Sequence, residues 1–249
     1  MELLFLGAGS VVPEAGRDTA SLLVNGRHMI DTGWSGGRNL LARGIDPLSI
    51  ETLIFTHFHH DHYLGLPQVL FVVGMKQAYA SGMARGLRIL GPAEHLERIV
   101  GISCSLLQWE RFPELQFPLE LIPVRPGDSR DLGDIQLATI AAKHTSGKGF
   151  DEPALSLRLT EKSSGRTIVY SGDTSYNPGL SDFARNSEAL IHDAAHSKPR
   201  EAAETARAGE VGRLFLVHHN SSEGTAKLEE AREVFHKSYL GVDGECFTI

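Results

Sequence analysis

Cysteine is scarce in this sequence of 249 residues, and long apolar runs are missing. Cys104 and Cys246 are far apart and neither stands in a C-x-x-C pattern, so neither a disulfide framework nor a thiolate zinc site is supported. No segment approaches the length of a membrane span. The short apolar start carries an acidic residue, whereas a signal peptide needs a basic start and a longer apolar core. Because two free thiols suit a reducing compartment, we expect a cytoplasmic protein without a membrane partner.

Positive charge is also in short supply. Lys and Arg number 24 against 31 Asp and Glu, which gives a formal net charge of −7. Nucleic-acid binding draws on clustered basic side chains that neutralise phosphates. The sequence has no basic run, and Lys76, Arg85 and Arg88 are too few to replace one. This balance favours a small-molecule substrate over a nucleic acid.

The remaining composition is that of an ordinary globular protein. Hydrophobic residues make up 41% and charged residues 22% of the chain, which is enough to bury a sizeable core. There is no Pro/Ser-rich linker or low-complexity run, and two-layered sheet folds commonly reach this length. We therefore expect one domain over residues 1–249, with the proline-containing stretch 112–126 as a loop that connects two halves.

The most informative stretch is residues 56–62, which read T-H-F-H-H-D-H and follow an apolar, strand-like segment. His57 and His59 are two residues apart, so both side chains can point to the same side at a strand end. If a helix begins next, Asp61 and His62 lie in its first turn and can aim at a second point nearby. Imidazole and carboxylate are ligands that zinc prefers, so the run predicts most of a two-metal site. An affinity tag, the alternative, would lie at a terminus and would lack the interposed Asp.

Three more strand-like segments end in residues of the same chemistry. His144 follows one apolar run, Asp173 ends a second, and His218 and His219 end a third. A single His at a strand end is more often a capping or surface residue. Side chains from several strands converge at one edge of a sheet, however, so together these residues can complete the metal site.

In their order and spacing these motifs resemble the metallo-β-lactamase-fold hydrolases, and above all the ribonuclease Z branch of that superfamily. The matching segments run nearly from end to end: residues 4–10 with Val12, Pro13 and Arg17; residues 30–33; residues 61–67, with "GLP" after the histidine motif; residues 90–92; residues 171–174, "SGDT"; residues 190–195, similar to "LIHEAT"; and residues 214–218, similar to "LxLTH". The resemblance implies an α/β fold, a four-layer αββα sandwich, and a metal-dependent hydrolase.

Carried over position by position, the resemblance also implies a set of metal ligands. The first ion would be held by His57, His59 and His144, and the second by Asp61, His62 and His218, with Asp173 bridging the two. We prefer His218 to His219 because it matches the family motif and keeps the parity of Leu214 and Leu216 along the strand. His60 replaces a Gly of the family pattern, and its parity favours a surface role or one outside the ligand shell. The two divalent ions are expected to be zinc, with manganese or iron as alternatives.

Two further residues are candidates for roles beside the metals. In ribonuclease Z a His-Ser-Thr motif before an Ala-rich helix supplies a His, and His196 stands at the matching position here, although Lys198 replaces the Thr. His196 would protonate a leaving oxygen or contact the phosphate, or else merely flank a helix. Asp31 is either a carboxylate that orients a ligand His or a turn residue before Gly33.

The chain departs from ribonuclease Z where that enzyme carries a long arm that grips transfer RNA. Between His144 and Asp173 there are only 173 − 144 = 29 positions, which a loop, a strand and a turn already fill. Together with the net charge, this argues against transfer RNA as the substrate.

The leading hypothesis is therefore a phosphodiesterase that acts on a small or cyclic phosphodiester. A hydroxide that bridges the two ions would attack phosphorus, with Asp61 accepting or orienting its proton. The alternatives are a carboxylic ester, lactone, thioester or sulfate ester hydrolase of the same fold, and a metal-binding sensor without catalysis. An iron redox role is disfavoured, because diiron members of the superfamily usually carry a carboxylate at the position of His59.

Three segments are left open by the sequence. Specificity is expected to depend on the loops at 11–19 and 145–152 and on the apolar stretch 71–86. That stretch forms a lid, a dimer face or part of the core. The resemblance also implies a homodimer, since ribonuclease Z-like proteins often form one.

Overall fold

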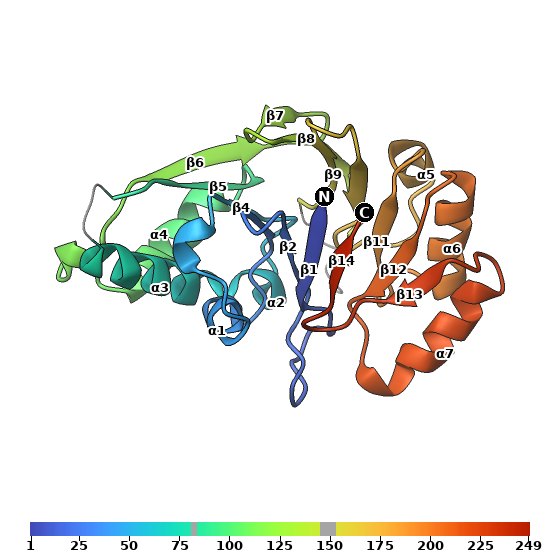
Figure 1. Ribbon diagram of the computed structural model, residues 1–249, viewed down its shortest axis with the longest axis horizontal. Helices are drawn as coiled ribbons and strands as arrows, with labels where there is room; N and C mark the ends of the chain where they lie inside the picture. The colour runs from blue at the N-terminus through green and yellow to red at the C-terminus, as the bar shows by residue number, and fades with distance from the viewer. Residues whose placement is uncertain (81–83, 145–152) are drawn as a thin grey trace.

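Strands of the computed structural model form two sheets that pack face to face, as Figure 1 shows for the described residues 1–80, 84–144 and 153–249. The first sheet has the order β14 (Cys246–Thr248), β1 (Glu2–Gly7), β2 (Ser21–Val24), β3 (His28–Ile30), β4 (Thr52–Ile54), β5 (Leu87–Pro92) and β6 (Leu119–Val124). The second has the order β13 (Ser238–Leu240), β12 (Leu214–Val217), β11 (Ala189–Asp193), β10 (Thr167–Tyr170), β9 (Leu155–Glu161), β8 (Ile135–Ala141) and β7 (Ser129–Asp131).

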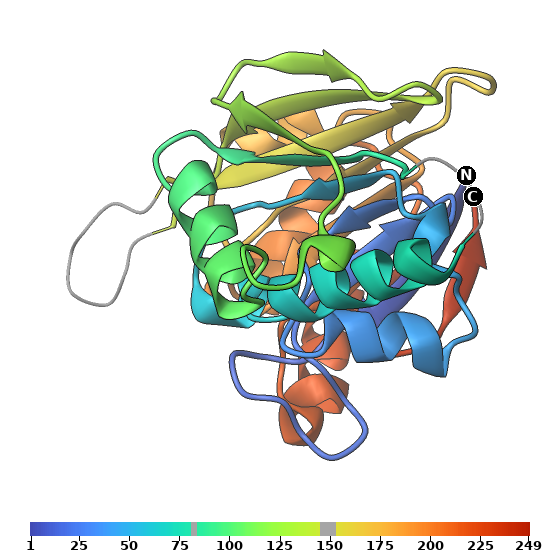
Figure 2. The same cartoon turned by 90° about the vertical axis from the view of Figure 1, so that its left-hand side faces the viewer.

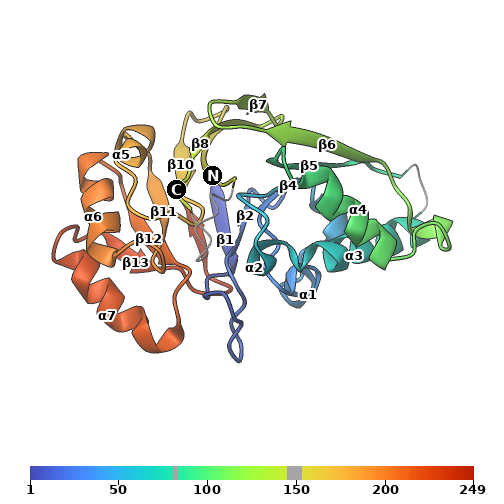
Figure 3. The same cartoon turned by 180° about the vertical axis from the view of Figure 1, so that it is seen from behind.

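Helices cover the outer face of each sheet. On the first sheet lie α1 (Gly36–Ala42), α2 (His60–Tyr63), α3 (Leu66–Tyr79) and α4 (Leu96–Leu106), with short 3₁₀ helices at Pro47–Ser49 and Pro113–Leu115. On the second lie α5 (Gly179–Phe183), α6 (Pro199–Ala208) and α7 (Ser221–Arg232). Figure 2 shows α3 and α4 in front of the first sheet, and Figure 3 shows the layers from behind. The predicted four-layer α/β sandwich is confirmed.

Side chains alternate between the two faces of each strand, and this divides the apolar residues among three core layers. In β12, Phe215 and Val217 pack between the two sheets, whereas Leu214 and Leu216 pack under the helices of the second sheet. In β4, Ile54 likewise faces the inter-sheet core. Successive side chains of a strand point to opposite faces. These strands are buried on both faces, which is why they read as continuous apolar runs.

Strand direction brings the chemically interesting strand ends together. Strands β10, β11 and β12 are parallel, and β8 runs the same way because β9 is antiparallel to both β8 and β10. Their carboxyl ends therefore lie along one edge of the second sheet. The segment after β4 reaches the same edge, since the backbone N–H of Leu155 donates to the carbonyl of Thr56 at 2.9 Å.

Two expectations about connecting segments need revision. Residues 112–126 are not all loop: the 3₁₀ helix Pro113–Leu115 is followed by β6, which includes Pro123. This strand is the edge strand of its sheet, where a proline is tolerated because one side of the strand needs no donor. Residues 71–79 belong to α3, where only Val73 and Gly74 of this stretch are buried, whereas Phe71 and Tyr79 are exposed. The described part of the stretch therefore lies mainly at the surface and not in the core; residues 81–83 lie outside the described chain.

Candidate metal centre

His57, His59 and His144 form the first of two clusters of ligand-type side chains. His57 and His59 follow β4, and His144 follows β8. Their ring centroids are 4.6–4.8 Å apart, and one nitrogen of each lies within 4.8 Å of the others. Nε2 of His144 is 2.9 Å from Nδ1 of His59. The three rings thus converge on one point, as the sequence predicted for the first ion.

Asp61, His62, Asp173 and His218 form the second cluster, and all four are buried. Asp61 and His62 lie in the first turn of α2, where they were expected. Oδ2 of Asp61 is 3.3 Å from Nε2 of His62 and 3.2 Å from Nε2 of His218. Two strand ends and one helix therefore supply this group.

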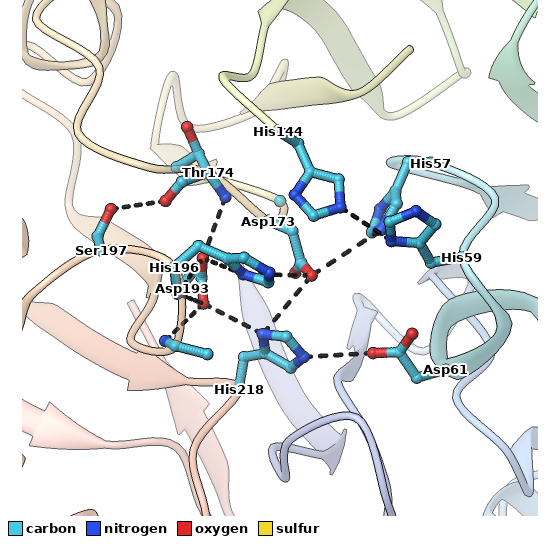
Figure 4. A network of polar contacts seen from close by, with 12 residues as sticks. His57, His59, Asp61, His144, Asp173, Thr174, Asp193, His196, Ser197 and His218 are labelled. Atoms are coloured by element: carbon cyan, nitrogen blue, oxygen red, sulfur yellow. Dashed lines mark hydrogen bonds and ion pairs between the residues drawn. The ribbon is translucent and has the colours of Figure 1, made fainter. Parts of the chain in front are cut away.

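Asp173 lies between the two clusters (Figure 4). Its Oδ2 atom is 3.9 Å from Nε2 of His57, in the first cluster. The same oxygen is 3.4 Å from Nε2 of His62 and 3.6 Å from Nδ1 of His218, in the second. This is the position that a carboxylate needs in order to bridge two ions.

The backbone before Asp173 requires glycine. Gly172 has φ of +59°, and a Cβ atom at this position would lie 2.6 Å from the carbonyl oxygen of Leu155. Any side chain would therefore combine a left-handed backbone with a steric clash. The "SGDT" sequence thus allows β9 to pass close to the turn that presents Asp173.

Buried nitrogens without a hydrogen-bond partner test whether metals fit these clusters. Among the described residues, Nε2 of His57, Nε2 of His62 and Nδ1 of His144 are buried and accept or donate no hydrogen bond. Such groups are costly unless a partner is present. Divalent cations would supply that partner for Nε2 of His57 and Nε2 of His62, which face the carboxylates of the clusters. The two clusters, which contain all seven predicted ligands, fit a site for two metal ions.

Asp31 holds one ligand of the second cluster from behind. Its Oδ2 lies 2.8 Å from Nδ1 of His62, which leaves Nε2 of that ring to face the cluster. Its Oδ1 accepts the backbone N–H of Thr56, and the Thr56 hydroxyl donates to Oδ2, both at 2.8 Å. Asp31 also has φ of 51°, so it is a turn residue as well. Asp31 thus fits both alternatives raised by the sequence: it orients His62 and it is a turn residue before Gly33.

Asp193, at the end of β11, is a site residue that the sequence reasoning missed. Its Oδ1 is 3.1 Å from Nδ1 of His218, and its Oδ2 is 2.9 Å from Nδ1 of His196. The backbone N–H groups of Thr174 and Ala195 also donate to it. The signal was present, because a carboxylate that ends an apolar strand was the reason for choosing Asp173. Asp193 joins a predicted ligand to the predicted acid.

His196 is the most exposed member of this network, with a side chain 36% exposed. Its ring stacks on His218, with centroids 5.3 Å apart. The hydrogen bond to Asp193 raises the pKa of His196, although burial opposes this. His196, His218, Asp173 and Asp193 also lie close enough to form a third ligand group. However, Asp193 already accepts several N–H donors, so it is better suited to orient side chains than to bind an ion.

The electrostatics of the two clusters differ. Burial lowers the pKa of His57 and lowers that of His144 to about 4, so both rings stay neutral, the form that binds metals. For His218 burial opposes the charge, but Asp173 together with Asp193 and Asp61 raises its pKa to about 10. The pKa of Asp173 is held low, against its burial, by His218 and His62. Without metal, the second cluster holds protons that an ion would displace.

His60, His218 and His219 lie where the sequence predicted, but the position of His218 has a different cause from the predicted one. His60 is exposed and contacts the ring of Tyr63. His218 is in the cluster, while His219 points elsewhere, with Nδ1 3.1 Å from the carbonyl of Asn220. Strand parity does not explain this, because β12 ends at Val217 and His218 has φ of 61°. The left-handed turn, not the strand, aims His218 at the site.

Of the loops expected to set specificity, one contacts the site and one lies outside the described residues. The hydroxyl of Thr19 donates to the carbonyl oxygen of Asp61 at 2.6 Å, so the loop after β1 supports the start of α2. Residues 145–152 are not among those described.

Comparison with known proteins gives consistent matches over the length of the chain. The family model described as "Anti-Pycsar protein Apyc1" matches residues 1–205. A ribonuclease Z of Picrophilus torridus is 27% identical to this chain, and the match covers 96% of this chain and 93% of the ribonuclease. Among solved structures, the metallo-β-lactamase fold protein YhfI from Bacillus subtilis superimposes with a TM-score of 0.80 at 20% identity, covering 99% and 98% of the two chains. The short form of human tRNase Z gives 0.76 at 22% identity, covering 100% and 99%.

Within the described part of the chain, no helix has the length and apolar character that crossing a membrane requires.

Proposed function

The chain belongs to the family of the anti-Pycsar protein Apyc1 and is a ribonuclease Z-like member of the metallo-β-lactamase superfamily, and from this premise we propose that it is a phosphodiesterase for small or cyclic phosphodiesters. That it is a metallo-β-lactamase-fold hydrolase follows from the relatives and the ligand clusters. The bond that it cleaves, the seven ligands and the role of His196 are parts of the proposal.

The contact between Asp193 and His196 is the observation that carries the proposal. Hydrolysis of a phosphodiester expels an alkoxide oxygen, which leaves far more readily when an acid protonates it. His196 lies beside Asp173 at 3.6 Å, is partly exposed, and has its pKa raised by Asp193. Its Nδ1 is occupied by Asp193, so Nε2 remains to deliver a proton.

The other residues of the site have complementary tasks. Two divalent ions, when bound, would generate the nucleophile from water at neutral pH and neutralise charge on the phosphate. Hydrogen bonds from His218 and His62 hold the pKa of Asp61 well below its usual range, although burial opposes this. Asp61 therefore stays ionised, and it can orient the attacking water or accept its proton while it also serves as a ligand. Asp31 fixes the ring of His62 for the same purpose.

Two features support a small substrate over transfer RNA. The interval between the third predicted His ligand and the bridging Asp contains β9, a turn and β10, so its described part, residues 153–172, has no arm. The formal charge of −7 also provides little attraction for a polyanion. A small or cyclic diester needs only the positive charge that two bound ions would supply locally.

The proposal is tested by comparing three substrates on protein of measured metal content: bis(p-nitrophenyl) phosphate, a p-nitrophenyl carboxylate ester and a lactone. We expect turnover of the diester alone, lost with a chelator and in His59→Ala, and retained in His60→Ala, which removes an exposed neighbouring His. Natural cyclic diesters would be assayed next. Turnover confined to the carboxylate ester or the lactone would instead establish the alternative hydrolase.

A further inference from the structure

A cavity of about 280 Å³ lies between the loop that follows β1 and helix α1. None of the seven predicted metal ligands lines it. Its charged lining residues are Arg17, Arg38 and Arg43 and the acids Glu14, Asp18 and Asp243. By formal charge the lining is balanced, so the partners of each group decide what the cavity can bind.

The three acids are already satisfied by the protein. Asp18 accepts four donors: the backbone N–H groups of Thr19, Trp34 and Ser35 at 2.8, 3.2 and 2.8 Å, and the Asn39 amide at 2.6 Å. Asp243 accepts the backbone N–H groups of Ala8 and Asp18, at 2.9 and 2.6 Å. Glu14 accepts from Arg17 at 3.0 Å and from the backbone N–H of Ser221 at 3.0 and 3.2 Å. These carboxylates hold the loop in place and have little capacity left for a ligand.

Of the three guanidinium groups, only that of Arg17 has partners among the residues that the structure describes. Arg17 is paired with Glu14 and also donates to the carbonyl of His219 at 3.3 Å. In the described parts of the chain, neither the exposed side chain of Arg38 nor the half-buried side chain of Arg43 has a hydrogen-bond acceptor or a carboxylate within ion-pair distance. Nε of Arg43 is buried without a partner, and the charge of Arg43 reaches Asp243 only at longer range.

We propose that this cavity is a binding site for a small oxyanion, a phosphate or a carboxylate, held between Arg38 and Arg43. The planar fork of a guanidinium matches the oxygens of both groups and forms strong, charge-assisted hydrogen bonds with them. The acids do not repel such a ligand strongly, because N–H donors already surround their oxygens. The site adjoins the metal centre through sequence neighbours: Asp18 lines the cavity, and Thr19 holds the carbonyl of Asp61.

Calorimetric titration of the metal-loaded protein with inorganic phosphate, and separately with acetate, tests the proposal. We expect Arg38→Gln/Arg43→Gln to lose one binding site that the wild type has, and each single variant to bind about tenfold more weakly or worse. Phosphate that binds at the metals persists in these variants, so the two sites are distinguished. The charge-matched control Arg27→Gln/Arg111→Gln, which changes two arginines that do not line the cavity, keeps every site.

The two anions separate the ligand classes. Binding of phosphate at the arginine-dependent site supports a phosphorylated ligand, and binding of acetate alone supports a carboxylate. If the wild type and the double variant bound each anion with the same stoichiometry and the same affinity, the proposal would be overturned. As a measurement that needs no variant, wild-type crystals soaked with arsenate, an analogue of phosphate, should show an anomalous peak between Arg38 and Arg43. A peak confined to the metal centre, together with no arginine-dependent binding of acetate in the titration, would contradict the proposal.

Discussion

Asp31 and His62 form a fully buried pair, with 2.8 Å between Oδ2 of Asp31 and Nδ1 of His62. Neither side chain has measurable exposure, and His62 belongs to the second ligand cluster. A carboxylate in this position fixes both the tautomer and the direction of the ring, and it raises the basicity of the nitrogen that faces the ion. We therefore expect the metal affinity of the proposed centre to depend on Asp31, which is not among the seven predicted ligands.

Asp31→Asn should weaken metal binding about 10–100-fold, because the amide cannot supply the negative charge that supports His62. Asn tolerates the left-handed backbone found here, so the fold should be kept. Competition with a chromophoric chelator measures the affinity. Asp46→Asn, an exposed carboxylate that caps a 3₁₀ helix, is the matched control and should leave affinity unchanged. Equal metal affinity in the two variants would show that Asp31 does not support metal binding.

His196→Ala should impair hydrolysis in a way that depends on the leaving group. An alkyl phosphodiester needs a proton on its departing oxygen, so its turnover should fall about 10²–10⁴-fold. A p-nitrophenyl diester expels a stable anion and should lose far less. Steady-state rates on both substrates, with His60→Ala as control, measure the difference. An equal loss on both substrates would show that His196 does not act as the acid.

Asp193→Asn should change the pH dependence on the alkyl substrate. The hydrogen bond from Asp193 raises the pKa of His196, so its loss lowers that pKa. An acid must be protonated to act, and activity therefore falls as the pH rises through its pKa. The falling limb of kcat/KM should consequently move to lower pH in the variant. A limb that stays in place, or moves to higher pH, would contradict this role.

The two clusters of ligand-type side chains could be predicted from the sequence because their members are concentrated at strand ends with recognisable spacing. His57, His59, Asp61 and His62 lie in one short run, and Asp173 follows the glycine that its turn requires. The sandwich itself was predicted from the family resemblance, because the residue pattern alone does not indicate which strands pair.

The structure added what depends on three-dimensional placement. Asp193 was overlooked because its importance arises from two rings contributed by separate segments, at His196 and His218. The choice of His218 over His219 rested on the family motif and on strand parity, whereas a left-handed turn after β12 brings His218 into the cluster. Pro123 suggested a loop, yet an edge strand accommodates it. In each case a contact between distant segments, or one backbone angle, decided the outcome.

Metal affinity and metal-free stability should respond oppositely to pH. The pKa of His218 is raised to about 10 from its usual value of 6.5, chiefly by Asp173, against the effect of burial. A metal must displace this proton, so affinity should rise by up to about tenfold per pH unit below that pKa. In the metal-free protein, the protonated His218 contributes stability that is fully present below 6.5 and is lost as the pH rises through about 10.

Thermal unfolding over this pH range, with chelator and with saturating zinc, measures both trends. The chelated protein should melt at falling temperatures as the pH rises, while the stabilisation by zinc grows. His219→Ala is a control, because it removes a buried His that lies outside the ligand clusters. Parallel trends with and without zinc would show that His218 is not protonated in the metal-free state.

Gly172→Ala should destabilise the fold more than a glycine substitution with the same backbone conformation elsewhere. Gly165 has φ of +73° with nothing near its Cβ position, so Gly165→Ala should cost only the left-handed strain, about 1 kcal/mol. Gly172 adds a contact of 2.6 Å with the carbonyl of Leu155, and its substitution should cost roughly 2–4 kcal/mol. Urea unfolding in chelator excludes any effect of metal loss. Equal costs would mean that the turn before Asp173 can move away from β9, and that this glycine does not fix the bridging carboxylate.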